Sequence, residues 1–349
     1  MNVLFWGTPA YAVPSLNALH AVGHRLVGVV SQPDRRRGRG SAVVPSPVKA
    51  RALELGIPVF TPERIRRQPE LQAELAALGA DISVVVAFGQ LLPPEVLAQP
   101  PLGCWNGHGS LLPRWRGAAP IQWSLIDGDA ETGVGIMAME EGLDTGPVLL
   151  ERAIPIGLLE NAQQLGERLS VLTGELLVEA LPRIEAAGPG PESERLGRLQ
   201  VRPQSDEGLT TARLLTKTDF TIDWGQSALA VHRRVMGLFP AAHTSWRGQR
   251  LKLLATEPLV QRLAAQLSPQ AAALAARWAS PAEHAPPGTV LALEAGHGVV
   301  VATGGCPLLI RQAQLAGKSS CGGQVLLQQL GATAGDQLDV HGIETSPIG

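Results

Sequence analysis

Short segments that are predominantly apolar constrain the fold of this chain more than any other feature. The clearest covers residues 81–88, in which Val84, Val85 and Val86 follow one another. Similar segments occur at 2–6, 25–31, 102–108 and 133–140, with helical patterns at 10–22 and 118–126 between them. Strands that are apolar on both faces and alternate with helices form mostly parallel sheets covered by helices on each side. The sequence therefore predicts a doubly wound, Rossmann-like α/β domain whose ligands bind beyond the carboxyl ends of the strands.

The chain has 349 residues, which is long for a single core, so we expect two domains. A long helix predicted at 162–187 closes the first domain, and glycine and proline at 188–191 interrupt the pattern. We assign residues 1–188 to the first domain, 189–208 to a linker and 209–349 to the second domain. In the second domain a helix at 228–238 and short β-like segments with glycine turns predict a small, OB-like β-barrel. An alanine-rich stretch at about 258–287 is interpreted as an insertion.

Composition narrows the classes of function. The formal net charge of −2 argues against a protein that coats nucleic acid. No apolar segment is long enough to cross a bilayer, and the first strand begins too early for a leader peptide. The cysteines are odd in number and lack metal-ligand spacing: Cys104, Cys306 and Cys321. We therefore expect a reduced cytoplasmic protein without structural zinc.

A cluster of arginines stands out from this charge balance. The loop after the second predicted strand holds Arg35, Arg36, Arg37 and Arg39. Such a cluster is ordinarily a solvated loop. The residues alone leave that interpretation open beside a phosphate-binding one.

The turn after the first strand argues against the usual nucleotide cofactors. It contains one glycine, Gly7, where the dinucleotide fingerprint requires three. The chain also has no Gly-Lys-Ser/Thr sequence placed to suit a phosphate-binding loop. Nicotinamide and nucleoside triphosphate cofactors are therefore not expected.

Polar side chains gather after the predicted strand at 102–108. Asn106 and His108 are two residues apart, so in an extended chain they face the same side. An amide can donate to a developing oxyanion, and an imidazole exchanges a proton near neutral pH. Asp144, set between glycines, would orient such an imidazole or bond its own backbone in a tight turn. A histidine with a purely structural role remains the alternative to catalysis.

The residues Asn106, His108 and Asp144, with Gly-Ser-Leu-Leu-Pro at 109–113, resemble the signature of the folate-dependent formyltransferase superfamily. The resemblance implies transfer of a formyl group from 10-formyltetrahydrofolate to an amine, without a metal. It also implies that these three residues are catalytic. Asn106 and protonated His108 would stabilise the oxyanion, and Asp144 would hold the imidazole.

Flanking segments resemble one branch of this superfamily, the one that formylates initiator methionyl-tRNA for translation initiation. They lie at 7–9, 32–35, 38–40, 45–49, 114–122, 128–133 and 142–146, and in the second domain at 222–224, 287–290 and 316–318. The resemblance implies a monomer whose partners are folate and this tRNA. A sugar-nucleotide formyltransferase, a formyltetrahydrofolate hydrolase and a non-catalytic RNA-binding protein are the alternatives.

The same resemblance assigns further site residues. Those expected to contact folate are Phe88, Gly89, Gln90, Leu91, Leu92, Ser110, Leu111, Leu112, Pro113 and Leu143. Those expected to contact tRNA are Arg35, Arg36, Arg37, Arg39 and Lys49. A second RNA-facing surface on the barrel would use Lys217, Arg233, Arg234, Arg247, Arg250 and Lys252.

The sequence departs from this family at a few positions. Gly107 stands where the family usually has a β-branched or other apolar residue, and would loosen the strand end or let a ligand approach closely. Ser41 and Ala42 replace a frequent lysine pair, which lowers the positive charge of the arginine loop. The segment 239–242 and the alanine-rich insertion also differ from the usual pattern.

Overall fold

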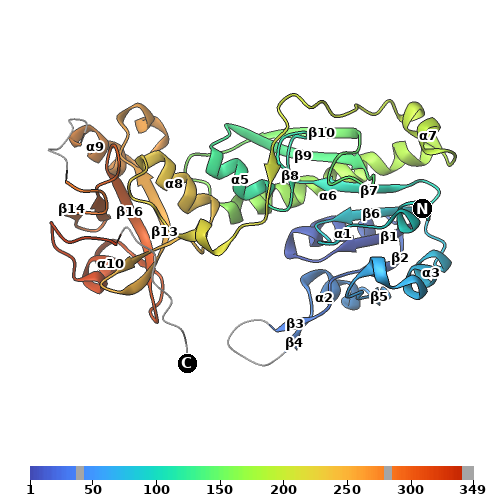
Figure 1. The fold of residues 1–349 in the computed structure, drawn as a ribbon, viewed down its shortest axis with the longest axis horizontal. Coiled ribbons are helices and arrows are strands. Elements are labelled where there is room, and N and C mark those ends of the chain that lie inside the picture. The colour runs from blue at the N-terminus through green and yellow to red at the C-terminus, as the bar shows by residue number, and fades with distance from the viewer. Residues whose placement is uncertain (37–42, 279–284, 340–349) are drawn as a thin grey trace. The chain divides into compact units, whose positions relative to one another are not determined.

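The apolar segments of the first domain form one sheet. The computed structural model describes residues 1–36, 43–278 and 285–339. Within these residues the strand order is β10 (Val148–Pro155), β9 (Glu131–Ala138), β7 (Cys104–His108), β6 (Ile82–Val86), β1 (Asn2–Gly7), β2 (Arg25–Val30) and β5 (Val59–Phe60) (Figure 1). Neighbours from β7 to β5 are parallel, whereas β9 is antiparallel to β7 and β10. The predicted doubly wound, mostly parallel sheet is confirmed.

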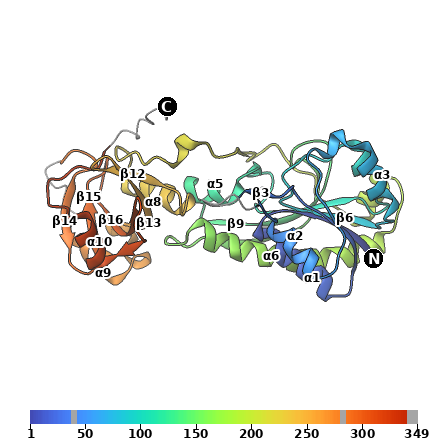
Figure 2. The ribbon, with the colours of Figure 1, turned by 90° about the horizontal axis from the view of Figure 1, so that it is seen from below.

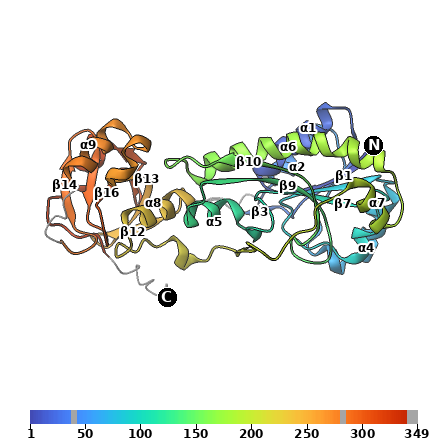
Figure 3. The same ribbon diagram turned by 90° about the horizontal axis from the view of Figure 1, so that it is seen from above.

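Helices cover both faces of this sheet. On one face lie α1 (Val13–Ala21), α2 (Pro47–Glu54) and α6 (Ala162–Ala187), and on the other lie α3 (Pro69–Ala77) and α4 (Pro94–Leu97) (Figures 2 and 3). Every residue of β6 is buried, which is why its sequence, apart from Ser83, is apolar without alternation.

The order of the strands creates a crevice at one edge of the sheet. From β1 the chain runs to β2 and β5 on one side, and then returns to β6 and β7 on the other. The carboxyl ends of β1 and β6 therefore flank the point where the strand order reverses, which is where open α/β sheets bind ligands. The shorter elements of this region are η1 (Ala10–Ala12), β3 (Arg35–Arg36), β4 (Val43–Val44), η2 (Ile65–Arg67), β8 (Arg116–Gly117), α5 (Pro120–Asp127) and β11 (Thr211–Ala212).

The chain divides into two units at boundaries that differ from the predicted ones. The first unit comprises Met1–Pro120, Glu131–Pro155 and Gly166–Leu214, and the second comprises Ile121–Ala130, Ile156–Leu165 and Leu215–Gly349. The prediction of a linker at 189–208 is corrected, because this segment belongs to the first unit and contains the helix α7 (Glu192–Leu199). Glycine and proline do interrupt the chain after α6. The polar stretch beyond them concealed a helix that buries Arg195 and Leu199.

The second unit is built on antiparallel strands. Its strands run in the order β12 (His243–Trp246), β13 (Gln249–Pro258), β16 (Leu308–Leu315), β15 (Gly298–Val301) and β14 (Val290–Glu294), and β17 (Cys321–Gly322) pairs with β16. Bridges from Ser245 to Asp339 and from Thr289 to Gln337 bring residues 337–339 against the two edges of this sheet. The helical elements are η3 (Lys217–Phe220), α8 (Ala228–Gly237), η4 (Gln261–Gln266), α9 (Pro269–Arg277) and α10 (Gly323–Leu330). The predicted alanine-rich insertion therefore contains η4 and α9, and residues 279–284 of it lie outside the described residues.

A buried carboxylate fixes the start of α9. Glu257, at the end of β13, is 4% exposed. It accepts hydrogen bonds from the backbone and hydroxyl of Ser268, the N-cap of α9, at 2.7 and 2.8 Å. Arg311 on β16 donates to the same carboxylate at 2.6 Å. No helix in the described part of the chain is both long enough and apolar enough to span a membrane.

Arg311→Met should destabilise the second unit, because it leaves the buried Glu257 without its cation. The expected loss in free energy of unfolding is about 3 kcal/mol. The matched control is Arg277→Met, which breaks an ion pair with Glu294 whose arginine is 56% exposed and should cost less than about 1 kcal/mol. Chemical denaturation followed by tryptophan fluorescence measures both. Equal losses in the two variants would contradict a special role for the Glu257 pair.

Candidate active site

The three predicted catalytic side chains meet at the carboxyl end of β7. Asn106 and His108 lie on this strand, and Asp144 comes from the loop between β9 and β10. The amide nitrogen Nδ2 of Asn106 donates to Oδ1 of Asp144 at 3.3 Å. The ring nitrogen Nδ1 of His108 lies 3.6 Å from Oδ2 of the same carboxylate. The side chains of His108 and Asp144 are 7% and 11% exposed, so they face each other largely out of water.

Asp144 is held in a left-handed backbone conformation by contacts with other segments. Its φ is 53°, which is uncommon for a residue other than glycine but is tolerated by aspartate. The backbone N–H of Gly117 donates to Oδ2 at 2.8 Å, so the carboxylate is bound by another loop. The side chain of Gln204 donates to the backbone oxygens of Asp144 and Gly146 at 2.9 and 2.6 Å. Arg116 donates in turn to Oε1 of Gln204 at 2.9 Å, which fixes the direction of the amide.

The loop that carries Gly117 is held by the chain after α7. Residues of β8 pair in parallel with β11, and the N–H groups of Ala118 and Ala119 donate to the carbonyl oxygen of Ala212. Gly117 has a φ of 119°, and a Cβ on it would lie 2.8 Å from that same oxygen. Only glycine allows this approach, and the approach aims the Gly117 N–H at Asp144. The segment 209–214, which we predicted to begin the second domain, therefore supports the site in the first unit.

The hydrogen bonds of His108 determine which ring nitrogen is free to act. Nε2 lies 3.0 Å from the carbonyl oxygen of Trp115, which can only accept, so Nε2 carries a hydrogen. Trp115 has a φ of 61°, an outlier for so bulky a residue, and its own N–H donates to Oγ1 of Thr210 at 2.8 Å. Nδ1 is the nitrogen that faces Asn106 and Asp144. A hydrogen on Nδ1 as well makes the ring an imidazolium.

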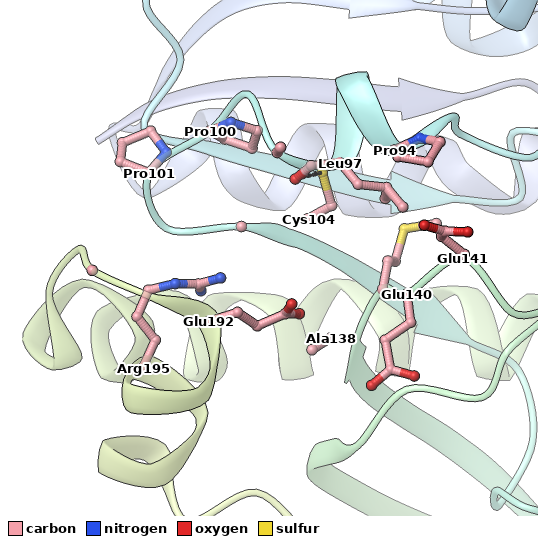
Figure 4. Close-up of a pocket in the computed structure, with 14 residues that line it drawn as sticks. Pro94, Leu97, Pro100, Pro101, Cys104, Ala138, Glu140, Glu141, Glu192 and Arg195 are labelled. Atoms are coloured by element: carbon pink, nitrogen blue, oxygen red, sulfur yellow. Dashed lines mark hydrogen bonds between the residues drawn. The ribbon is translucent and has the colours of Figure 1, made fainter.

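A cavity of about 490 Å³ opens beside β7, on the face of the strand that carries the side chain of Cys104 (Figure 4). Cys104, two residues before Asn106, forms part of its wall, and burial raises the pKa of this thiol to about 12. The wall also includes apolar side chains of α4, together with Met139, Glu140 and Glu141. Glu192 and Arg195 of α7 lie at one end of the cavity (Figure 4). Arg195 is 8% exposed and donates to the carbonyl oxygen of Leu102 at 2.7 Å. A volume of this size is typical of a site for a small organic ligand.

Comparisons with known proteins agree with this arrangement. Residues 1–181 match the sequence model described as Formyl transferase, and residues 214–331 match the model described as Formyl transferase, C-terminal domain. The chain belongs to the formyl transferase family.

Close relatives identify the branch of this family. The methionyl-tRNA formyltransferase of Synechococcus sp. (strain RCC307) is 73% identical over 333 residues, which is 95% of this chain and 100% of the relative. The methionyl-tRNA formyltransferase of Prochlorococcus marinus (strain MIT 9303) is 62% identical over 340 residues, or 97% of this chain and 99% of the relative. The resemblance to this branch is confirmed.

Solved structures support the fold. An N-formyltransferase from Helicobacter canadensis matches with a TM-score of 0.60 at 15% identity, over 89% of this chain and 98% of that one. HypX from Aquifex aeolicus, solved with tetrahydrofolic acid, matches with a TM-score of 0.59 at 17% identity, over 95% of this chain and 47% of that one. At these identities the likeness concerns the fold alone.

The structure separates the predicted folate residues of this formyl transferase into two groups. The side chains of Phe88, Leu92, Ser110 and Leu112 are buried in the protein, and the hydroxyl of Ser110 donates to the carbonyl oxygen of Arg114. Gln90 bonds the backbone at residues 62, 63 and 65, so its amide fixes a turn. The exposed members are Leu91 and Leu143, at 54% and 52%, together with Gly89 and the half-buried Leu111 and Pro113. Contacts with a ligand would fall to this second group and to backbone atoms.

The predicted tRNA residues are placed only in part. Arg35, Val44, Thr8 and Gly89 help to line a second cavity of about 360 Å³ at the carboxyl ends of β1 and β6. Lys49 pairs with Asp34 at 2.7 Å, which offsets its charge. Arg37 and Arg39 lie outside the described residues, as do Ser41 and Ala42.

Several of the basic residues predicted to face RNA on the second unit bind other groups of the protein instead. Arg233 and Arg234 donate to backbone carbonyl oxygens of their own unit. Arg247 stacks on Trp246 and pairs with Asp336 at 3.2 Å. Lys217 and Arg250 are exposed, and Lys252 is half-buried.

Sequence patterns did not indicate Gln204 or Arg195 as site residues. Gln204 follows a proline, and Arg195 lies in the polar stretch that we interpreted as a linker. Neither position has a local pattern that separates it from surface residues, because each acts on a segment far away in the chain. Among the described residues, no group of three or more histidine, cysteine, aspartate or glutamate side chains is arranged to hold a metal ion.

Gln204→Ala should lower kcat by about tenfold. The loop of Asp144 loses the two hydrogen bonds from the Gln204 side chain, so Asp144 is held less firmly in line with His108. Steady-state kinetics on the purified variant would measure this. Gln261→Ala, at an exposed position of η4, is the control and should retain full activity. Unchanged kcat in Gln204→Ala would show that Gly117 alone is enough to place the carboxylate.

Proposed function

We propose that this protein transfers the formyl group of 10-formyltetrahydrofolate to the α-amino group of initiator methionyl-tRNA. The convergence of Asn106, His108 and Asp144 at the end of β7 carries the chemical part of the proposal. The relatives at 62–73% identity, which are methionyl-tRNA formyltransferases, support the choice of acceptor.

The reaction requires stabilisation of charge on an oxygen. The substrate supplies a formyl carbon bonded to N10. The amine attacks this carbon, charge gathers on the formyl oxygen, and the bond to N10 breaks as the amine's proton passes to that nitrogen. Nδ2 of Asn106 and Nδ1 of His108 both lie against the carboxylate of Asp144, and we assign them as the donors for this oxygen. One such donor typically lowers the barrier by roughly 2.7–4 kcal/mol.

The remaining contacts of the trio explain why these donors are ready before the substrate arrives. Nε2 of His108 is fixed on Trp115, so the ring cannot turn its active edge away. Asp144 faces Nδ1 and compensates the positive charge of the imidazolium. Its second oxygen holds the amide of Asn106. Donors fixed in advance need no reorganisation during the reaction, which is the main source of their effect.

We place the pterin of the folate in the cavity of Figure 4. The apolar wall of Leu97, Cys104 and Met139 suits the flat ring, and the cavity shares its face of β7 with Asn106. Glu192 and Arg195 provide an acceptor and a donor for the amide and amine edge of the ring. The exposed Leu91 and Leu143 would cover the part of the folate nearer the formyl group.

We also place the acceptor end of the tRNA at the second cavity. Arg35 is exposed and lines this cavity at the carboxyl edge of the sheet, where a phosphate can reach it. Arg36, Arg37 and Arg39 follow it in the chain, and the sequence assigns them to the same tRNA contact. The charge of Lys49 is already offset by Asp34, so we assign it a smaller share.

Asn106→Ala and His108→Ala should each reduce formyl transfer by about a hundredfold or more, because each removes a donor to the oxyanion. The assay incubates pure protein with 10-formyltetrahydrofolate and charged initiator tRNA and detects formylmethionine after deacylation. Both variants should keep the wild-type unfolding midpoint. Transfer to an amino sugar nucleotide, or release of formate, instead of transfer to tRNA would keep the chemistry and reject the acceptor.

Arg35→Ala and Arg39→Ala should raise KM for the tRNA and leave KM for the folate unchanged. Each lost phosphate contact should also reduce the slope of log KM against log salt by about one. Arg25→Ala is the control, since Arg25 is exposed at the amino end of β2, at the opposite edge of the sheet. A salt slope equal to that of the wild type in both loop variants would remove the arginine loop from tRNA binding.

A further inference from the structure

The space beside Gly107 is filled from a distant helix. A Cβ built on Gly107 would lie 2.5 Å from Cγ2 of Thr173, whereas its contacts with Val86 and Ile136 would be ordinary, at 3.6 and 3.7 Å. The methyl group of Thr173, on α6, therefore occupies the volume that a side chain at 107 would take. Carbon atoms in van der Waals contact lie about 3.5–4.0 Å apart, so a side chain here would force a shift of about 1 Å.

Thr173 is fixed by two hydrogen bonds. Its hydroxyl donates to the carbonyl oxygen of Leu169 at 2.7 Å. Because that hydrogen is used, the hydroxyl of Tyr11 must be the donor in the contact of 2.9 Å between Tyr11 and Thr173. Burial raises the pKa of Tyr11 to about 12, so the phenol keeps this hydrogen across the physiological range. Thr173 has no freedom to turn its methyl group away without breaking these bonds.

The helix that carries Thr173 cannot move back either. The next residue, Gly174, packs against α1, where a Cβ would lie 3.3 Å from Ala18 and from the carbonyl oxygen of Pro14. Tyr11 lies in η1, directly after the turn in which Thr8 donates to the carbonyl oxygen of Phe88 at 3.0 Å. The contact therefore joins α6, the turn after β1 and the strand β7.

We propose that Gly107 and Thr173 are a matched pair of positioning residues, held by Tyr11, that sets the end of β7 and with it the catalytic residues Asn106 and His108. Gly107 is the residue between those two, so a displacement of its backbone moves both donors. The methyl group supplied from α6 takes the volume that a side chain at 107 would occupy. The proposal rests on the proposed function only in that turnover is its main readout.

The test uses a pair of double variants of the full chain. Gly107→Ala should lower kcat by about tenfold to a hundredfold with little change in KM for either substrate, because a shift approaching 1 Å at the reacting groups has this effect. Adding Thr173→Ser removes Cγ2 and keeps the hydroxyl, so Gly107→Ala/Thr173→Ser should recover most of kcat. Adding Thr173→Val keeps a methyl group and removes the hydroxyl, so that double variant should not recover.

Unfolding midpoints of the same variants separate positioning from stability. Rates are expressed per folded molecule. The change in midpoint of each double variant should differ from the sum of the changes in its two single variants, which shows that positions 107 and 173 are coupled. This comparison does not require turnover of any acceptor. Full kcat in folded Gly107→Ala, or equal recovery by Thr173→Ser and Thr173→Val, overturns the proposal. Absence of transfer by the wild type would reject the proposed function, while the coupling in midpoints would still report on the pair.

Discussion

The site depends on the position of one carboxylate, that of Asp144. It bonds the amide of Asn106, faces Nδ1 of His108 and accepts from the backbone of Gly117. A loop aspartate with a left-handed φ would not keep this position alone, because such a conformation costs of order 1–3 kcal/mol. Gln204 holds the backbone oxygens of Asp144 itself and of Gly146. The side chains that we propose as oxyanion donors are thus fixed before a substrate binds, which is the condition under which such donors lower a barrier most.

The support for this carboxylate comes from the segment that follows α7 within the first unit. Gln204 holds the Asp144 loop, Thr210 holds Trp115, and Ala212 receives the backbone of the loop after Gly117. Two residues with left-handed backbones, Trp115 and Asp144, therefore persist because a third segment fixes each of them. This arrangement explains why the boundary of the first unit falls at Leu214 and not at the glycine and proline after α6.

The two faces of β7 have separate tasks. Cys104 lines the cavity that we assign to the pterin, and Asn106 and His108 lie against Asp144. Gly107 faces the opposite helix layer, where the methyl group of Thr173 fills its place. Alternation along the strand lets one short segment present donors on one side while it is positioned from the other.

The sequence by itself determined the parts that local patterns encode. Apolar runs such as Val84 to Val86 require a sheet buried on both faces, and the spacing of Asn106 and His108 places both on one side of a strand. The family signature added Asp144, and the geometry is consistent with that assignment. The tertiary structure alone decided that Gln204, Arg195 and Thr173 belong with these residues. Gln204 and Arg195 contact segments that are 60 and 93 residues away in the chain, and Thr173 lies within a helix of ordinary pattern. No periodicity or motif therefore marks any of the three. Such contacts arise only when packing brings distant segments together, and for that reason the sequence did not reveal the support of the site, although it indicated the side chains that we propose as donors.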